Sequence, residues 1–262
     1  MTTEQPPTKP IGRLSEDELF NADHRPWPIP RGPWRMFQSW RDLLFAHWPV
    51  EPAELAHLMP RGLEAETFEG HAWVTIAPFW MADVALRPSP ALPGLATFPE
   101  LNTRTYVTLD NKPGVFFFSL DAGNRVAVEV ARAWYHLPYL KARMSIRTID
   151  ESIHYDSQRT DRRGNPAELR CWYRPTGPVY RSEPGSLDEW LTERYCLYAA
   201  DRHGRIYRAE INHQRWPLQP AEASFTTNTM LAAHGIELPD QPPLLHFARR
   251  LDVRAWQPVR IG

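Results

Sequence analysis

The stretch LNTRTYVTLDNKPGVFFFSL, residues 101–120, carries the strongest fold signal in the chain. Two apolar and β-branched runs, 101–109 and 115–120, flank the turn DNKPG at 110–114. Asp, Asn, Pro and Gly between two such runs are typical of a β-hairpin, because they adopt the backbone angles that a tight reversal needs. The sequence therefore predicts two antiparallel strands here.

Further strand-like runs occur on both sides of this hairpin, and most are separated by short polar turns. The paired runs are 63–68 with 72–79, 139–149 with 153–159, and 197–200 with 206–211. Short helices are predicted at 52–58, 124–135 and 186–195 from apolar spacing and capping residues. Adjacent hairpins with few helices predict the α+β class, with a predominantly antiparallel sheet curled into a barrel or cone.

The N-terminal end differs in composition from the rest. Residues 1–33 contain seven prolines, which remove backbone donors and resist continuation of a helix or strand. We expect a proline-rich arm over 1–33 and a single β-rich domain over 34–262.

Overall composition limits the classes of partner. The 30 basic and 31 acidic side chains nearly balance, and no stretch is basic enough for the phosphate contacts of a nucleic-acid-binding protein. The two cysteines, Cys171 and Cys196, are far apart, which argues against a disulfide scaffold. No secretory signal is evident, and no apolar run approaches the ~20 residues that span a bilayer. We expect a cytoplasmic protein without a membrane or nucleic-acid partner.

Most catalytic and cofactor motifs are absent from the sequence. There is no G-x-G-x-x-G, no phosphate loop and no G-x-S-x-G element. The ten histidines never occur at the spacings typical of a metal site. We therefore predict neither a cofactor nor a metal, and the polar residues in apolar settings become the candidates.

The run FPELNTRTYV, residues 98–107, places four polar side chains at alternate positions. Alternate residues of a strand share a face, so Glu100, Asn102, Arg104 and Tyr106 line one side together. The rigid fork of an arginine suits a carboxylate, which predicts binding of a small polar or anionic molecule. The alternative is a solvated outer face on which Glu100 pairs with Arg104.

A second polar group surrounds a helix end and the strand that follows. It contains Arg132, His136, Tyr139 and Lys141. If the polar face of this strand looked into a barrel, desolvation and the neighbouring Arg143 would lower the pKa of Lys141 and make it a nucleophile for carbonyl compounds. The chain has only three lysines: Lys9, Lys112 and Lys141. The alternative is that Lys141 points to water on an outer face.

Two further sites have simpler interpretations. Glu193 and Arg194, at a helix-to-strand junction, form either a structural ion pair or a pocket wall. His47 lies among aromatic residues, where a hydrogen-bonded core histidine is more common than a catalytic base.

The same residues carry a family resemblance. The chain resembles the bacterial YqjF-like family, domain of unknown function 2071, in segments that run in order over roughly residues 34–260. The matching segments include LFAHWPV (44–50), FPELNTRTYV (98–107), VFFFSLDA (115–122), HLPY (136–139) and LTERY (191–195). That family is in turn similar to the acetoacetate decarboxylase fold, which implies a β-rich cone around a closed cavity.

The resemblance to acetoacetate decarboxylase also has consequences for catalysis. Glu100 loosely matches the glutamate of an aromatic-x-Glu motif, and the Phe-Pro-Lys-Lys motif of that fold falls on residues 137–140. Tyr139 and Leu140 stand where the two lysines would be, and Lys141 lies two residues beyond the Schiff-base position. A shift of two residues returns the side chain to the same face of the strand but moves it by about 6–7 Å along the strand.

Three functions fit these observations. The leading hypothesis is a cavity for a small polar or carboxylated molecule, with Glu100, Asn102, Arg104 and Tyr106 on one wall and Arg132, His136, Tyr139 and Lys141 opposite. The alternative is an enzyme acting on a keto acid or related carbonyl compound, as a decarboxylase, aldolase or dehydratase, through Lys141 or through acid–base chemistry of Glu100 and Tyr139. A third hypothesis is an interaction module, and a homo-oligomer formed at a sheet edge is compatible with any of them.

Overall fold

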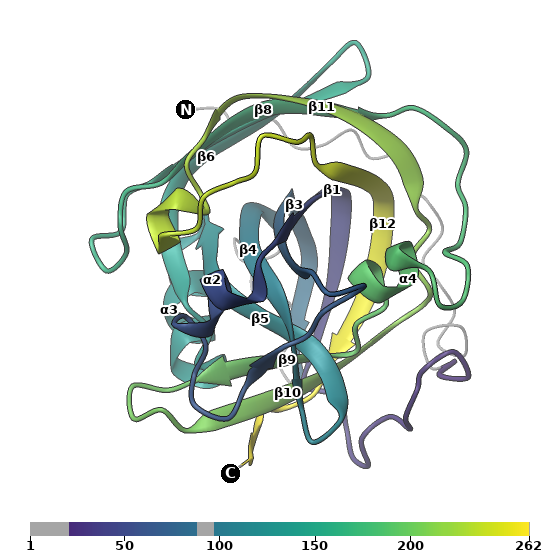
Figure 1. Cartoon of the computed structure of the whole chain (residues 1–262), viewed down its shortest axis with the longest axis vertical. Coiled ribbons are helices and arrows are strands. Elements are labelled where there is room, and N and C mark those ends of the chain that lie inside the picture. The colour runs from purple at the N-terminus through teal and green to yellow at the C-terminus, as the bar shows by residue number, and fades with distance from the viewer. Residues whose placement is uncertain (1–20, 88–96, 262) are drawn as a thin grey trace.

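The computed structural model describes residues 21–87 and 97–261. Most of these residues form β-strands, joined by a few short helices, as Figure 1 shows. The strands are β1 (Met36–Val50), β2 (Glu64–Ala65), β3 (Ala72–Leu86), β4 (Thr97–Leu109), β5 (Lys112–Ala122), β6 (Tyr139–Ile149), β7 (Ser152–Arg159), β8 (Glu168–Pro175), β9 (Cys196–Ala200), β10 (Ile206–His213), β11 (Gln219–Asn228), β12 (Leu244–Ala255) and β13 (Val259–Ile261). The helices are α2 (Pro52–Ala56), α3 (Arg125–Tyr135), α4 (Leu187–Thr192) and the 3-10 turn η1 (Ala232–His234).

Three predicted hairpins are present, and one is wrong. β4 pairs with β5, β6 with β7, and β9 with β10, all antiparallel. The run at 63–68 does not pair along 72–79; only Phe68 and His71 form an isolated bridge. β3 pairs instead with β1 and β4, because these long apolar strands bury more surface than the short segment before the turn.

The strands close into two rings that share one wall. The pairings β4–β5 and β10–β12 close a seven-stranded ring of β1, β3, β4, β5, β9, β10 and β12. The pairings β5–β6 and β11–β12 close a nine-stranded ring of β1, β3, β4, β5, β6, β7, β8, β11 and β12. In Figure 1, β8 and β11 lie above the shared strands and β9 and β10 below them. The predicted α+β class and the closed, barrel-like sheet are confirmed.

The five shared strands β12, β1, β3, β4 and β5 are covered on both sides. The side chains on their two faces therefore pack into two different cores. On β1, Leu43 and Phe45 belong to the core within the seven-stranded ring. Leu44 and Ala46 belong to the core within the nine-stranded ring. The period-2 alternation of a strand thus assigns each side chain to one core or the other.

Part of the predicted arm is described. Residues 21–33 contain no helix or strand, and residues 1–20 lie outside the described part of the chain. Arg25 and Trp27 both donate hydrogen bonds to the carboxylate of Glu210 on β10, at 2.9 and 2.7 Å. This end of the arm is therefore fixed to the seven-stranded ring.

No helix in the described ranges 21–87 and 97–261 has the length and apolar character required to span a membrane.

A buried ion pair joins β5, a strand of the shared wall, to β7, which belongs to the nine-stranded ring alone. Asp121 on β5 and Arg159 on β7 have almost no exposed side-chain surface, and their charged groups meet at 2.9 Å. Arg159 also donates to Ser119 Oγ at 2.8 Å. Burial raises the pKa of Asp121 to about 6, and the guanidinium of Arg159 opposes that rise.

We predict that Arg159→Met lowers the free energy of unfolding by about 3–5 kcal/mol at pH 7, because it leaves the Asp121 carboxyl buried without its partner. The loss should shrink below pH 6, where Asp121 is protonated. Urea unfolding at pH 7.5 and pH 5 measures both quantities. Arg143→Gln, on an exposed part of β6, is the control and should change stability by less than about 0.5 kcal/mol. Equal effects of the two substitutions would contradict the structural role assigned to the pair.

Candidate functional site

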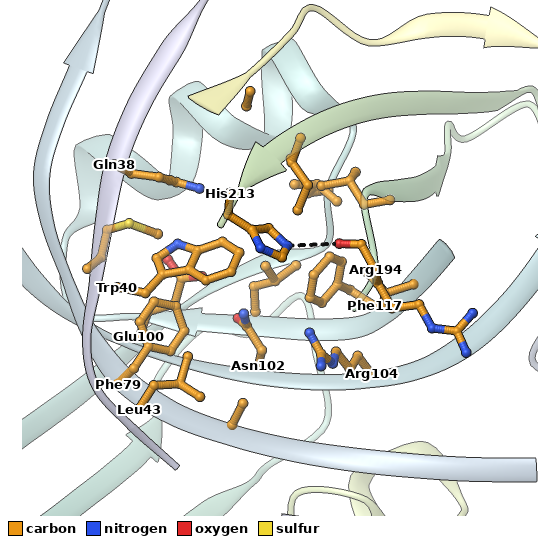
Figure 2. A pocket seen from close by; sticks show the side chains of 18 of the residues that line it. Gln38, Trp40, Leu43, Phe79, Glu100, Asn102, Arg104, Phe117, Arg194 and His213 are labelled. Atoms are coloured by element: carbon orange, nitrogen blue, oxygen red, sulfur yellow. Dashed lines mark hydrogen bonds between the residues drawn. The ribbon is translucent and has the colours of Figure 1, made fainter. Parts of the chain in front are cut away.

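A cavity of about 70 Å³ lies inside the seven-stranded ring, and we call it the central cavity. Most of its wall is apolar, including Leu43, Phe79 and Phe117. Its polar side chains come from β1, β4, β6, β10, α3, α4 and the segment after α4. Figure 2 shows Glu100, Asn102 and Arg104 projecting from β4 into the same space as Trp40 and His213.

The structure places three of the four polar residues of β4 in this cavity. Glu100, Asn102 and Arg104 line it, and all three are buried. The alternative of a solvated face does not hold. Tyr106 does not line the cavity: its hydroxyl hydrogen bonds with Thr75 Oγ1 at 2.8 Å and its ring packs beneath Arg104. Tyr106 thus supports the wall without contributing a free polar group.

Glu100 and Tyr139 form a hydrogen-bonded pair in which the pKa values of both side chains are raised. Glu100 is 1% exposed, and the Tyr139 hydroxyl donates to both of its carboxyl oxygens at 3.1 Å. Burial raises the pKa of Glu100 to about 8, against the opposing hydrogen bonds of Tyr139 and Asn102. Burial also raises the pKa of Tyr139 well above its ordinary value. At pH 7 Glu100 is therefore mostly a neutral acid that carries one transferable proton.

Two arginines reach the same cavity from different elements. Arg104 is 7% exposed and Arg194 is 5% exposed, and both guanidinium groups lie over the ring of Tyr106. Arg194 pairs with Glu66, but its Nη2 has no hydrogen-bond partner among the described residues. Arg104 donates weakly to the Leu191 carbonyl at 3.4 Å, and its Nε is likewise without a described partner. Each arginine keeps donor capacity for a bound molecule.

The pocket-wall interpretation of Arg194 agrees with its position. Glu193 does not pair with it; Glu193 accepts hydrogen bonds from the Tyr195 hydroxyl and from the Trp216 backbone N–H. The actual partner of Arg194 is Glu66, which sequence reasoning missed because it lies 128 residues away with no motif around it.

Several lining residues gave no local signal in the sequence. His213 on β10 is fully buried, its Nε2 lies 3.2 Å from the Arg194 carbonyl, and burial lowers its pKa. The indole N–H groups of Trp40 and Trp216 and the Tyr135 hydroxyl are buried without a described partner. Buried polar atoms are rarely left without a hydrogen bond, so this concentration around one cavity indicates a place for a polar ligand or ordered water.

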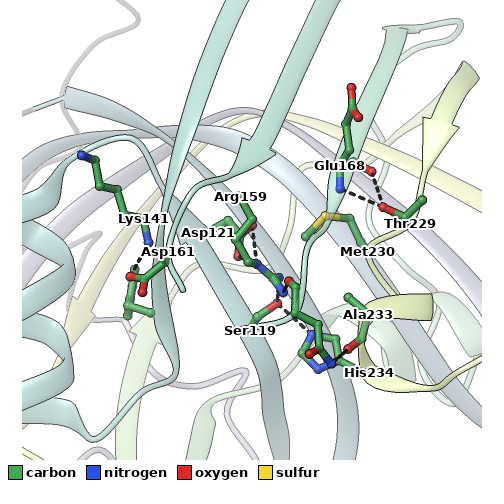
Figure 3. Close-up of polar contacts among 12 residues, drawn as sticks. Ser119, Asp121, Lys141, Arg159, Asp161, Glu168, Thr229, Met230, Ala233 and His234 are labelled. Carbon is green, nitrogen blue, oxygen red and sulfur yellow. Dashed lines mark hydrogen bonds and ion pairs between the residues drawn. The ribbon is translucent and has the colours of Figure 1, made fainter. Parts of the chain in front are cut away.

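The structure corrects the Schiff-base hypothesis for Lys141. Its side chain is exposed and absent from the cavity wall. Figure 3 shows it pointing away from the buried polar groups, while its backbone N–H donates to Asp161 at 3.1 Å. Lys141 shares a face of β6 with Tyr139. It lies two residues further along the strand, beyond the part of β6 that lines the cavity.

Arg132 and His136 also lie outside the central cavity, contrary to prediction. His136 ends α3 in a left-handed conformation with φ of 55°, and its ring packs against Tyr207. Both residues line an open hollow of about 650 Å³, which we call the surface basin. The basin is lined by Phe118, Arg132, His136, Leu137, Pro138, Leu140, Arg163, Gly164, Asn165, Ala200, Asp201, Arg202, His203, Arg205, Ala233 and His234.

His47 is a buried core residue. Its Nδ1 hydrogen bonds with Thr75 Oγ1 at 2.9 Å, and burial lowers its pKa well below the ordinary value. Over the described ranges 21–87 and 97–261, no group of three or more His, Cys, Asp or Glu side chains could hold a metal ion.

Comparison with known proteins agrees with the predicted family. Residues 37–252 match the family DUF2071, described as an uncharacterized conserved protein. The chain is 46% identical over 232 residues to the uncharacterized protein YqjF of Bacillus subtilis (strain 168), covering 88% of this chain and 94% of that protein.

Solved structures share the fold at low sequence identity. An enduracididine biosynthesis enzyme, MppR, superposes with a TM-score of 0.61 at 12% identity, over 89% of this chain and 91% of MppR. An acetoacetate decarboxylase-like enzyme from Sphingomonas wittichii RW1 gives 0.60 at 14% identity, over 91% and 98% of the two chains. Acetoacetate decarboxylase from Legionella pneumophila gives 0.57 at 13% identity, over 95% and 98%. The predicted acetoacetate decarboxylase-like architecture is confirmed.

The raised pKa of Glu100 predicts a pH-dependent stability difference. Between pH 5 and 8 the folded chain retains the Glu100 proton that the unfolded chain loses, so the free energy of unfolding falls as pH rises. Relative to Glu100→Gln, stability should fall by about 1.4 kcal/mol per pH unit in this range and level off above pH 8. Urea unfolding at a series of pH values measures the difference.

Glu129→Gln is the control for that experiment. Glu129 is exposed and its pKa lies below the ordinary value, so it is ionised in both states across the range. Parallel stability curves for the wild type and Glu100→Gln would contradict the raised pKa.

Proposed function

The chain belongs to the uncharacterised family DUF2071, and we propose that it uses its acetoacetate decarboxylase-like barrel to bind one small, carboxylated organic molecule in the central cavity. The proposal rests on the charge balance of the cavity wall.

Two of the buried side chains on that wall are arginines, and only one of them has a carboxylate partner. Arg194 is neutralised by Glu66, whereas no described carboxylate lies within ion-pair distance of Arg104. Glu100, the remaining carboxyl group of the wall, is mostly neutral at pH 7 because burial raises its pKa to about 8. The cavity wall therefore carries one uncompensated positive charge, and a monocarboxylate balances it.

Size and donor geometry support the same class of ligand. A cavity of about 70 Å³ is smaller than the ~150 Å³ engineered cavity that holds benzene, so the molecule has few heavy atoms. Arg104 Nε and Arg194 Nη2 offer N–H groups to carboxylate oxygens.

The structural relatives add support by analogy. MppR has been solved in complex with pyruvate, a small monocarboxylate, and its chain superposes on this one with a TM-score of 0.59. A lysine-dependent reaction does not transfer to the described cavity, because Lys141 is exposed and Lys112 pairs with Glu210.

We predict that acetate, propionate and pyruvate raise the melting temperature, whereas the matched amides acetamide and propionamide do not. A ligand at 100 times its Kd stabilises a fold by about 2.7 kcal/mol. Arg104→Gln should weaken carboxylate binding roughly 10- to 100-fold, since a charge-assisted hydrogen bond and the balancing charge are lost. Arg143→Gln, the exposed control, should respond like the wild type. An Arg104→Gln protein with an undiminished response would rule out this site.

Acid–base catalysis on a carbonyl compound is a second candidate, favoured by the Glu100–Tyr139 pair. A neutral acid with a pKa near 8 suits proton donation at neutral pH. In this reaction the Glu100 proton passes to the carbonyl oxygen of a bound keto acid while water removes a proton from the adjacent carbon. In the return step a solvent proton adds to that carbon and the enol hydroxyl gives its proton back to Glu100, which regenerates the keto form.

We predict that the protein accelerates exchange of the methyl protons of pyruvate in deuterated water, and that the rate falls as pH rises through 8. Glu100→Gln should abolish the acceleration and Tyr139→Phe should shift its pH dependence. Proton NMR follows the exchange. A rate equal to spontaneous exchange, or an active Glu100→Gln protein, would leave binding as the function.

A further inference from the structure

The surface basin is strongly basic, although the chain as a whole is nearly neutral. Seven cationic or titratable basic side chains line it, from α3, the turn after it, the 163–165 loop, the β9–β10 turn and η1. Asp201 is the one acidic residue on its wall. The basic side chains are Arg132, His136, Arg163, Arg202, His203, Arg205 and His234.

Not all of this charge is compensated within the protein. Arg163 is held by Glu129 and Asp161, and Arg205 is held by Asp201. No described carboxylate forms an ion pair with the remaining two arginines. Arg132 gives one N–H to the Tyr139 carbonyl at 2.8 Å, and Arg202 Nε lies 3.1 Å from the ring of His203. Both guanidinium groups keep N–H donors for an external anion.

His234 belongs to the buried network in Figure 3. Arg159 donates to Ser119 Oγ at 2.8 Å, and the same oxygen hydrogen bonds with His234 Nε2 at 3.1 Å. Burial and Arg159 lower the pKa of His234 to about 4, so the ring stays neutral at pH 7. The network therefore fixes a neutral ring on the wall of the basin.

The inner wall of the basin is apolar. Phe118, Leu137, Pro138 and Leu140 contribute to it, and the ring of Phe118 lies 5.7 Å from the ring of His234. Cationic donors beside an apolar, partly aromatic wall suit a ligand that is anionic at one end and flat or apolar at the other. We propose that the surface basin is a second binding site, which takes a small phosphorylated molecule with an aromatic or apolar portion.

This site is separate from the central cavity. Leu137 is the residue that lines both, so its side chain forms part of the partition between them. At about 650 Å³ the basin is also far larger than the central cavity. Ligand binding in the basin goes beyond the proposed function, because it uses residues other than the polar residues of the central cavity.

Isothermal titration of the full-length protein at constant ionic strength tests the proposal with phenyl phosphate, inorganic phosphate and phenol. We expect phenyl phosphate to bind more tightly than inorganic phosphate, and phenol to bind least. Arg132→Gln and Arg202→Gln should each weaken phenyl phosphate binding at least about tenfold, because each removes a charge-assisted contact. Arg143→Gln is the matched control, since it removes an exposed arginine from the outer face of β6 and should leave binding unchanged.

Three results would overturn the proposal: no binding of phenyl phosphate, equal affinity for inorganic phosphate, or the same loss in Arg143→Gln as in the basin variants. Arg104→Gln separates the two sites. It should leave phenyl phosphate binding intact while it weakens the response to monocarboxylates, so failure at one site does not imply failure at the other. Loss of phenyl phosphate binding in Arg104→Gln would place the ligand in the central cavity and overturn the basin site.

Discussion

The five strands β12, β1, β3, β4 and β5 belong to two closed rings at once, so that both faces of this shared wall are largely buried. In the covered part of the wall a strand has no solvent side on which to place a polar residue. Side chains in the middle of β4 alternate between two cores, as the burial of Leu101 on one face and Glu100 on the other shows. On these strands a polar side chain is retained where a hydrogen bond, an ion pair or a ligand offsets the cost of its burial. The polar side chains of β4 therefore indicate a site.

Two buried carboxyl groups of the wall, those of Asp121 and Glu100, are compensated in different ways. On the face toward the nine-stranded ring, Asp121 meets Arg159 directly and forms an ion pair. On the opposite face, Glu100 meets the Tyr139 hydroxyl and keeps its proton. The first arrangement joins two layers of the fold. The second leaves the charge of Arg104 unbalanced in a buried cavity, and the proposed carboxylate binding rests on this imbalance.

The sequence predicted the parts of the site that depend on local periodicity. The turn at 110–114 and the alternation of β4 placed Glu100, Asn102 and Arg104 on one face. Lys141 was misplaced because alternation specifies a face and not how far along the strand the covering elements extend. Trp40 and His213 were missed because they reach the cavity through ring closure, a long-range pairing that leaves no local pattern. Glu66 was missed because it meets Arg194 from 128 residues away.

The protonation state of Glu100 is the most direct test of this account. The side-chain carboxyl carbon of Glu100 can be followed by NMR across a pH titration and assigned by its absence in Glu100→Gln. A titration midpoint near pH 8 is expected in the ligand-free protein, because burial raises the pKa of Glu100. A midpoint near the ordinary value of 4.5 would mean that Glu100 is ionised at neutral pH and balances Arg104 itself, which would contradict a cavity built to receive a carboxylate.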